Sequence, residues 1–312
     1  MRNFVSDTNI DFMSRGRWAA IVSGSLLVIS LLAILVRGLN FGVDFTGGYT
    51  IEVGYQNPPD LNVIRDTLAG TDLPDAQVQS FGTSTDVLIR MAPREGLSGA
   101  DVSSEVLSTL RGTSDAPIEM RRVEFVGPQV GVELREKGGL AILTALIGIA
   151  IYVWVRFEKK FALGSVLATV HDVVVTVGVF AVFGIEFDLT VLAAVLAVIG
   201  YSLNDTIVVF DRIRENFRLQ RTGTPAEIMN AAINQTLSRT LITSGTTLIV
   251  VISLYLFGGE IINGFSLALL VGIGFGTYSS IFVASLLVYW LGVSREDLMP
   301  VVKEGADLDA MP

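Results

Sequence analysis

The chain has 312 residues, of which 51% are hydrophobic, and it contains no cysteine and a single histidine. Its long apolar runs are typical of a polytopic membrane protein and exclude an ordinary soluble domain. The net charge of −9 argues against nucleic acid as a partner, and the lack of cysteine excludes disulfides and thiolate metal sites.

The polar tail 1–17 carries three arginines and leads into an apolar run, Trp18–Val36, that ends at Arg37. A cleaved signal peptide has a shorter apolar core and a cleavage site of small residues. The residues after Arg37 offer no such site. We therefore expect residues 18–37 to form a retained first transmembrane helix.

Residues 38–138 form a polar segment about the size of one small domain. Runs of alternating or β-branched residues, typical of strands, are separated by two helical patterns. The expected strands are Tyr49–Tyr55, Ala76–Ser80, Asp86–Met91 and Ile118–Val126, and the expected helices are Asp60–Ala69 and Ala100–Leu110. The order βαββαβ is that of a ferredoxin-like α+β domain.

Five further apolar runs predict a five-helix transmembrane bundle over residues 139–291. They are Gly139–Val155, Phe161–Phe183, Leu189–Phe210, Thr240–Phe257 and Phe265–Leu291. Val132–Lys137 is a candidate interfacial extension of the first of these runs. The predicted fold class is a polytopic α-helical membrane protein. It has six transmembrane helices and a ferredoxin-like extracytoplasmic domain between the first and second spans.

Positive charge predicts the orientation of the chain in the membrane. Loops 156–160 and 211–239 are rich in lysine and arginine, whereas loops 184–188 and 258–264 carry neither. Because cytoplasmic loops carry an excess of these residues, the basic loops and both termini, including the tail 292–312, are expected in the cytoplasm. The 38–138 domain is then expected in the periplasm.

The basic loop also contains a predicted helix start, Thr224-Pro225-Ala226-Glu227, with an N-cap, a first-turn proline and a capping-box glutamate. Apolar residues then recur on one face at helical spacing: Ile228, Met229, Ala232, Ile233 and Leu237. This pattern predicts an amphipathic helix that lies on the inner membrane surface.

An Asn-Asp pair, Asn204-Asp205, interrupts the fourth of the six apolar runs. Ionisable groups inside a bilayer are costly and usually face the bundle interior or a water-filled path. Asp205 is therefore a candidate proton carrier, with a structural hydrogen-bonding role between helices as the alternative. Asn204 is its candidate packing or hydrogen-bonding partner.

Arg239 begins the fifth run, and hydroxyl side chains recur around it at helical spacing: Thr236, Thr240, Thr243, Ser244 and Thr247. In one interpretation these hydroxyls bond to carbonyls of their own helix and the arginine extends to the membrane surface. In the other they line a hydrated path in which Arg239 pairs with Asp205. The sequence does not favour either.

His171-Asp172 falls near the middle of the third run. Adjacent side chains point about 100° apart on a helix, so the two need not serve the same partner. A lone histidine is more often a satisfied polar group than a proton relay. Asp172 at this depth is a second candidate for the proton path, and His171 is included with it.

Glycines mark two further features. Gly47-Gly48 and the pair Gly127 and Gly131 flank the polar domain and predict joints between this domain and the membrane bundle, because glycine permits positive φ and close approach. In the last run, small residues at four-residue spacing predict close helix packing. They are Gly272, Gly276, Ser280 and Ala284.

These features together resemble the SecD/SecF family of bacterial protein-export membrane proteins, within the resistance-nodulation-division (RND) superfamily. The resemblance covers nearly the whole chain, including the order of the spans and the polar domain. It is carried by the stretches Asp44–Gly48, Val126–Gly131, Asn204–Asn216 and Arg239–Gly245.

The resemblance implies a multi-pass protein of the bacterial inner membrane that pairs with SecD and docks on the SecYEG channel. The small accessory subunit YajC is a further candidate partner. Such a unit uses the proton gradient to help draw unfolded preproteins into the periplasm. Asp205 and Arg239 match the family's intramembrane proton-pathway residues, and His171 and Asp172 match polar positions. The resemblance implies no enzyme activity and no cofactor besides protons.

Two other functions remain open from the residues alone. The first is a proton-coupled RND-type exporter of small molecules or lipids. The second is a passive scaffold, which would have no use for a buried carboxylate.

Overall fold

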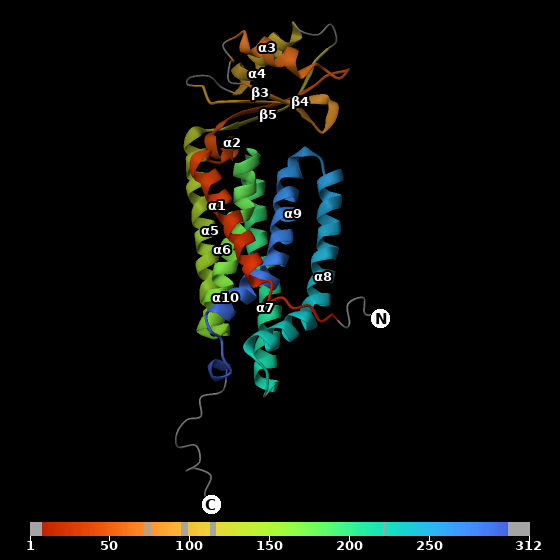
Figure 1. Cartoon of the computed structure of the whole chain (residues 1–312). Helices are drawn as coiled ribbons and strands as arrows, with labels where there is room; N and C mark the ends of the chain where they lie inside the picture. Colours follow the sequence, from red (N-terminus) through yellow and green to blue (C-terminus); the bar gives the residue numbers. More distant parts are fainter. Residues whose placement is uncertain are drawn as a thin grey trace, which may run out of the picture.

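The computed structural model describes residues 8–298, except 72, 74–75, 95–98, 113–116 and 221. Parts of the two predicted tails, residues 1–7 and 299–312, therefore lie outside the described residues. A small sheet domain lies above a bundle of long helices (Figure 1). The predicted fold class is confirmed.

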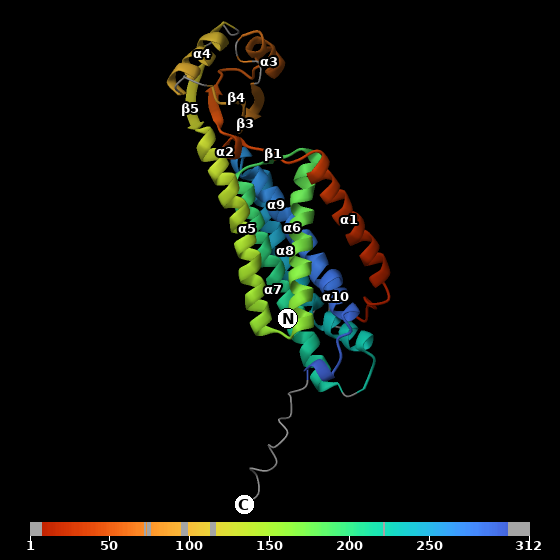
Figure 2. The same ribbon diagram turned by 90° about the vertical axis from the view of Figure 1, so that its left-hand side faces the viewer.

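Six helical segments of the described chain are long and apolar enough to cross a membrane, and each contains one predicted run. They are α1 (Gly16–Val36), α5 (Pro128–Arg156), α6 (Lys159–Phe183), α7 (Leu189–Leu219), α8 (Pro225–Phe257) and a last segment made of α9 (Asn263–Tyr278), η2 (Ser279–Ala284) and α10 (Ser285–Trp290). Helix α7 packs against α6, α8 and α9, whereas α1 is an outer helix beside α6 (Figure 2).

The sheet domain has the predicted βαββαβ order. Its antiparallel sheet has the strand order β3-β4-β2-β5. The elements are β2 (Gly48–Gly54), α3 (Leu61–Ala69), β3 (Gln77–Phe81), β4 (Thr83–Met91), α4 (Gly99–Arg111) and β5 (Glu119–Val126). Both helices cover one face, where Ile51, Ile89, Leu68 and Val106 form part of a buried apolar core. The other face looks toward the bundle (Figure 1).

Short elements join this domain to the bundle. Strand β1 (Asn40–Phe41) pairs in parallel with β6 (Glu186–Phe187) of the loop between α6 and α7. Helix α2 (Val43–Thr46) follows β1 and packs against α5. An ion pair between Arg90 of β4 and Glu186 spans the cleft, about 490 Å³ in volume, between the sheet and the bundle.

Helix α5 begins at Pro128, directly after β5, and continues into the membrane segment without a break. The candidate interfacial segment Val132–Lys137 is therefore part of one long helix. Proline is well suited to this first turn, since an N–H group there has no partner within the helix.

Helix α8 starts at the predicted capping box. Thr224 Oγ1 accepts a hydrogen bond from the Glu227 backbone N–H at 3.3 Å, and Glu227 Oε2 accepts one from the Thr224 N–H at 2.8 Å. The helix bends after a first part that lies across the lower end of the bundle (Figure 1).

The expectation that the apolar face of this first part is embedded in the membrane surface is wrong. Its predicted apolar residues are buried in one protein core with Phe12, Ile213 and Phe217. The end of α7 and the segment 10–13 provide the apolar partner, so the protein itself covers this face.

Two asparagines of α8 hold the segment 10–13 in place. Asn230 Oδ1 accepts hydrogen bonds from the backbone N–H groups of Phe12 (2.9 Å) and Met13 (3.0 Å). Asn234 accepts from the Ile10 N–H at 3.0 Å and donates to the Ile10 carbonyl at 2.8 Å. The chain before α1 is thereby fixed to α8.

Candidate functional site

Asp205 lies on α7 and is 3% exposed. Its Oδ2 accepts a hydrogen bond from Ser244 Oγ of α8 at 3.2 Å. The same Ser244 oxygen lies 3.2 Å from the Tyr201 hydroxyl of α7 and 2.8 Å from Thr277 Oγ1 of α9. Three helices therefore meet at one polar junction that includes a buried carboxyl group.

Arg239 is exposed on α8, five residues before Ser244 in the sequence. No ion pair joins Arg239 to Asp205 in the described part of the chain, although its charge acts on the carboxyl group through space. The structure therefore brings the two residues near each other without direct contact.

The hydroxyl side chains of the stripe on α8 have two kinds of partner. The hydroxyls of Thr236, Thr243 and Thr247 donate to backbone carbonyls of their own helix at 2.9–3.1 Å. Ser244 instead points inward and donates to Asp205. Asn204 is exposed on α7 and lies outside this junction. A turn of about 100° separates it from its neighbour on the helix.

A second buried carboxyl group lies on α6. Asp172 is fully buried, and its Oδ1 lies 2.8 Å from Nδ1 of His171, which is 4% exposed. Its Oδ2 accepts a hydrogen bond from Ser202 of α7. The adjacent His171 and Asp172 therefore contact each other, which the angular separation of helix neighbours did not suggest.

Ser202 is a site residue that the sequence reasoning missed. It lies three residues before Asp205, so both are on one side of α7, and it is bonded to Asp172. The spacing of Ser202, Asp205 and Thr206 was the available signal, because such a polar cluster is rare in a transmembrane helix.

The small residues of the last span lie at its contact with α7. A Cβ added to Gly276 would lie 3.3 Å from Ser202 Cβ, and one added to Gly272 would collide with Val198. Ser280 and Ala284 are fully buried. Close approach of α9 to α7 therefore holds Ser202 in place.

The predicted joints are packed closely. Gly47 has φ +74°, and an added Cβ would lie 2.8 Å from Pro128 Cα, whereas at Gly48 (φ +143°) it would collide with the Met91 carbonyl. At Gly131 an added Cβ would lie 2.7 Å from the Gly47 nitrogen. Gly127 meets no such constraint, because its φ is −64° and the nearest atom to an added Cβ is 4.0 Å away. Three of the four glycines are therefore required by the geometry.

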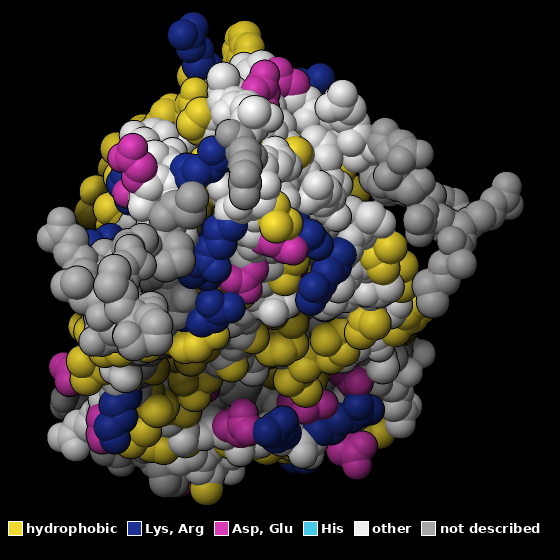
Figure 3. Space-filling model, turned by 90° about the horizontal axis from the view of Figure 1, so that it is seen from below, with side chains coloured by type: hydrophobic (Ala, Val, Ile, Leu, Met, Phe, Trp, Pro, Cys, Tyr) yellow, Lys and Arg dark blue, Asp and Glu magenta, His cyan; other side chains and the backbone are white. Residues whose placement is uncertain are grey.

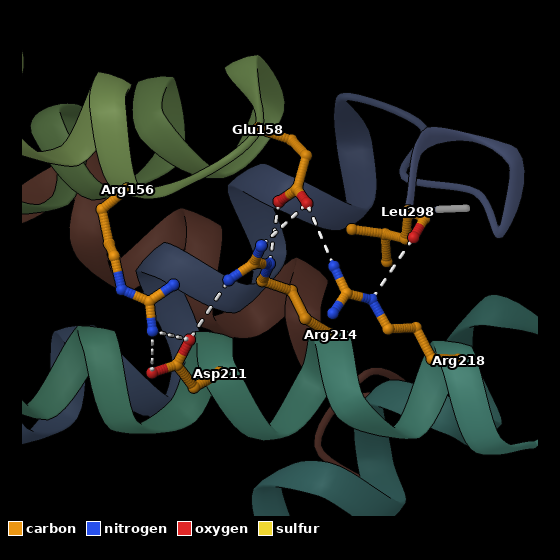
Figure 4. Close-up of polar contacts among 6 residues, drawn as sticks. All are labelled: Arg156, Glu158, Asp211, Arg214, Arg218 and Leu298. Carbon is orange, nitrogen blue, oxygen red and sulfur yellow. Dashed lines mark hydrogen bonds and ion pairs between the residues drawn. The ribbon is translucent and has the colours of Figure 1, made fainter. Parts of the chain in front are cut away.

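The opposite end of the bundle carries an ion-pair cluster (Figure 4). Asp211 of α7 contacts Arg156 at 3.2 Å and Arg214 at 3.3 Å, and Glu158 contacts Arg214 at 2.8 Å and Arg218 at 3.7 Å. The cluster joins the α5–α6 loop to the end of α7. Lysine and arginine side chains spread over this face of the molecule (Figure 3).

Comparisons with known proteins agree with this architecture. A family model described as "Protein export membrane protein SecD/SecF, C-terminal" matches residues 105–294, and one described as "SecD/SecF GG Motif" matches residues 32–59. The second match includes Gly47 and Gly48, which join the sheet domain to the bundle.

Two curated relatives are similar over almost their whole length. The protein translocase subunit SecF of Vibrio alginolyticus is 52% identical over 309 residues, which are 98% of each chain. The SecF subunit of Escherichia coli O157:H7 is 49% identical over 300 residues, which are 95% of this chain and 93% of the relative.

The crystal structure of SecDF from Thermus thermophilus is similar to this one with a TM-score of 0.82 and 35% sequence identity. The match covers 93% of this chain and 40% of that longer chain. SecDF in a "Super-membrane-facing form" matches with a TM-score of 0.70. By family model, identity and fold, the chain belongs to the SecD/SecF family of protein export membrane proteins.

Proposed function

We propose that this chain is a SecF-type subunit that uses the proton gradient to assist late translocation and release of preproteins at the SecYEG channel. A place in the Sec export pathway, as a multi-pass inner-membrane protein, follows from the similarity to protein translocase subunits over almost the full chain. Use of the proton gradient and association with the SecYEG channel are the proposed parts of this function.

The observation that carries the proposal is the junction around Asp205. A hydroxyl group can serve a carboxylate as a donor or a carboxylic acid as an acceptor, so Ser244 is compatible with either protonation state. The exposed Arg239 adds a cation at a distance that depends on how α7 and α8 are placed. Movement of α8 relative to α7 therefore changes the proton affinity of Asp205.

The coupling also works in reverse. By thermodynamic linkage, proton binding must bias the same helix movement that alters proton affinity. A membrane potential of 100 mV supplies about 2.3 kcal/mol for each charge that crosses the membrane. This energy corresponds to roughly a fifty-fold bias, at about 1.4 kcal/mol per factor of ten. Such a bias is enough to give a transport cycle its direction.

The test replaces Asp205 with asparagine, which keeps the shape of the side chain but cannot ionise. Preprotein release is measured in inverted vesicles with and without an uncoupler, and Asp66→Asn on the exposed side of α3 is the control. We expect the uncoupler-sensitive part of release to be lost in Asp205→Asn and kept in the control. Wild-type uncoupler sensitivity in Asp205→Asn would make Asp205 a structural residue.

The proposed orientation places both termini in the cytoplasm and the sheet domain in the periplasm. Ser84 and Thr222 are exposed at opposite ends of the molecule, and the chain has no cysteine of its own. In cells with a permeabilised outer membrane, an impermeant thiol reagent should label Ser84→Cys and spare Thr222→Cys. The reverse pattern would invert the proposed topology.

SecD is the proposed partner because the chain spans only 40% of the fused SecDF chain that it resembles. A separate SecD chain would supply the remainder. Mild solubilisation and affinity purification should recover SecD together with this chain, and YajC is a further candidate in the same experiment. Recovery without SecD would contradict the proposed pairing.

A further inference from the structure

We propose a second proton-exchange site, formed by Asp172, His171 and Ser202, which buried water connects to the basic end of the bundle along a track of hydroxyl side chains. The site is enclosed by α6, α7 and η2. This inference rests on the proposed proton coupling and deepens it, since it adds a second proton-binding site to the path.

An unpartnered ring nitrogen lies at the site. His171 Nδ1 bonds to Asp172, but Nε2 is buried and no hydrogen-bond partner for it exists among the described residues. A buried polar atom without a partner is destabilising, and native proteins commonly satisfy such atoms with internal water. The free ring nitrogen therefore indicates water next to the pair.

Buried hydroxyl side chains lead away from the site along α6 and α7. Ser165, Thr169 and Asp172 lie on one face of α6 at spacings of four and three residues, and Thr206 lies one turn from Ser202 on α7. All of these side chains are almost completely buried. The hydroxyls of Ser165 and Thr206 have no hydrogen-bond partner in the described part of the chain, so they are further candidates for bound water.

The track has a direction. Ser165 and Thr169 lie between Asp172 and Lys159, where α6 begins at the basic end. Thr169 and Thr176 both donate to carbonyls of their own helix, at 3.0 and 2.7 Å. The unpartnered hydroxyl of Ser165 lies on the basic-end side of Asp172, and in the described part of α6 none lies on the other side. We therefore infer that the water track opens toward the basic end and stops at Asp172.

The π-helical turn η2 lies beside the site. It packs against both α6 and α7, and its Ser279 lies close to the Asp172 carboxyl group. Single π-helical turns within α-helices are frequent at functional sites. Small buried residues here, Ser279 and Ser280, leave more room beside Asp172 than large apolar side chains would.

Few charged groups face the site. On α6 the ionisable neighbour is His171, and on α7 Asp205 lies three residues after Ser202. The Tyr278 hydroxyl of α9 is instead engaged with α1, where it donates to the Ala19 carbonyl at 3.1 Å. The apolar stretches of α1 and α5 carry no charged residue between Arg17 and Arg37 or between Lys137 and Arg156. Protonation at this site is therefore controlled mainly by the pair itself and the adjoining hydroxyls.

The proton balance is simple. With Asp172 ionised and His171 neutral, the site carries one negative charge. Uptake of one proton from a water of the track, on either the carboxylate or the imidazole, removes the net charge, and release returns that proton to the track. Ser202 and Asp205 lie on the same side of α7, so a shift of α7 acts on both carboxyl groups.

The first test measures hydration, using single cysteines in this cysteine-free chain. Ser165→Cys and Thr206→Cys lie on the track, Thr176→Cys lies beyond Asp172, and Ser266→Cys is an equally buried control whose hydroxyl is bonded within its own helix. Vesicles of both orientations receive Ag⁺, a small thiol-reactive ion. Maleimide labelling after denaturation then reports the thiols that remain.

We expect Ag⁺ applied at the basic end to modify Ser165→Cys and Thr206→Cys about tenfold faster than the other two, because thiols react where water reaches them. Equal protection of all four positions would show a dry interior and overturn the track. Equally fast reaction of Thr176→Cys would overturn Asp172 as its end point.

The second test detects the proton itself. Infrared difference spectra of the purified full chain across a pH series show the C=O stretching band of each carboxyl group that changes its protonation. Asp172→Asn should remove one band, and His171→Gln should shift that band. Asp205→Asn should leave it in place. A spectrum of Asp172→Asn identical to wild type would show that Asp172 does not exchange protons.

Neither test depends on export, so the two proposals can fail separately. Persistent uncoupler-sensitive release in Asp205→Asn would refute the proposed function and leave the hydrated Asp172 site intact. Loss of that release, together with a dry track or an unchanged Asp172→Asn spectrum, would refute only the second site.

Discussion

The sheet domain and the membrane bundle both bury apolar cores, but they differ in their outer surfaces. In the sheet domain, Ile51, Leu68 and Ile89 are buried in an apolar core, whereas the bundle exposes large apolar residues such as Leu143 and Ile249. Removing apolar surface from water stabilises the domain. Lipid is as apolar as leucine, so close packing of small residues and polar contacts must hold the helices together.

The buried carboxyl groups of the two regions differ as well. In the sheet domain, Asp86 lies 2.6 Å from the guanidinium group of Arg121 and accepts a hydrogen bond from Thr83 at 2.8 Å. Among the described residues of the bundle, Asp172 and Asp205 contact hydroxyl groups and a histidine, and neither contacts an arginine or lysine. Asp86 therefore has a cationic partner, whereas a hydroxyl partner can donate to a carboxylate or accept from a carboxylic acid.

Truncating a leucine in each region tests this contrast most strongly. Leu68→Ala leaves a cavity in the domain core and should lower the free energy of unfolding of the domain by about 2–5 kcal/mol. Leu143→Ala, on the exposed side of α5, leaves no cavity and should change stability by less than about 1 kcal/mol. Hydrogen exchange of the β2 and β4 amides and thermal unfolding in micelles measure the two effects. Equal losses would contradict the contrast.

A smaller effect is expected at the joint between the regions. In Gly131→Ala the added Cβ meets the backbone of Gly47 and Phe45, which should destabilise the joint by about 1–3 kcal/mol. Gly139→Ala on the same helix is the matched control, because no atom lies within 4 Å of its Cβ. Thermal unfolding of both purified variants should separate them. Equal unfolding temperatures of the two variants would show that the joint accommodates the added methyl group without loss of stability.

The smallest effect concerns Asp297, just beyond the last span. Partial burial acts to raise its pKa, but hydrogen bonds from Lys160 and Ser294 outweigh it and hold the pKa below the usual value. This carboxylate therefore stabilises the 294–298 turn fully above about pH 4 and loses that contribution as the pH falls through the lowered pKa.

Hydrogen exchange of the Ser294 amide, corrected for the intrinsic effect of pH, should show protection falling over this acidic range. In Asp297→Asn the Ser294 amide should be weakly protected at every pH, because a neutral side chain replaces the charged acceptor. A wild-type turn whose protection does not change with pH would refute the role of this carboxylate.

Much of the fold could be predicted from the sequence because its signals are local. Alternating residues placed β2 and β4 to within a few residues, and apolar runs placed the six spans. The capping box placed the start of α8 at Pro225. For the apolar face of the first part of α8, the sequence predicted contact with lipid, whereas the structure shows contact with protein. An apolar stripe has the same sequence pattern in both cases.

The candidate sites divide in the same way. The sequence by itself determined that Asp172 and Asp205 lie within apolar spans, since the cost of a carboxyl group in lipid singles them out. Only the tertiary structure decided that the Ser244 hydroxyl donates to Asp205 and the Ser202 hydroxyl to Asp172. It also decided that Arg239 contacts neither carboxyl group in the described chain. These contacts join residues 30 and 39 positions apart. Helix packing sets such distances, and no local periodicity encodes them.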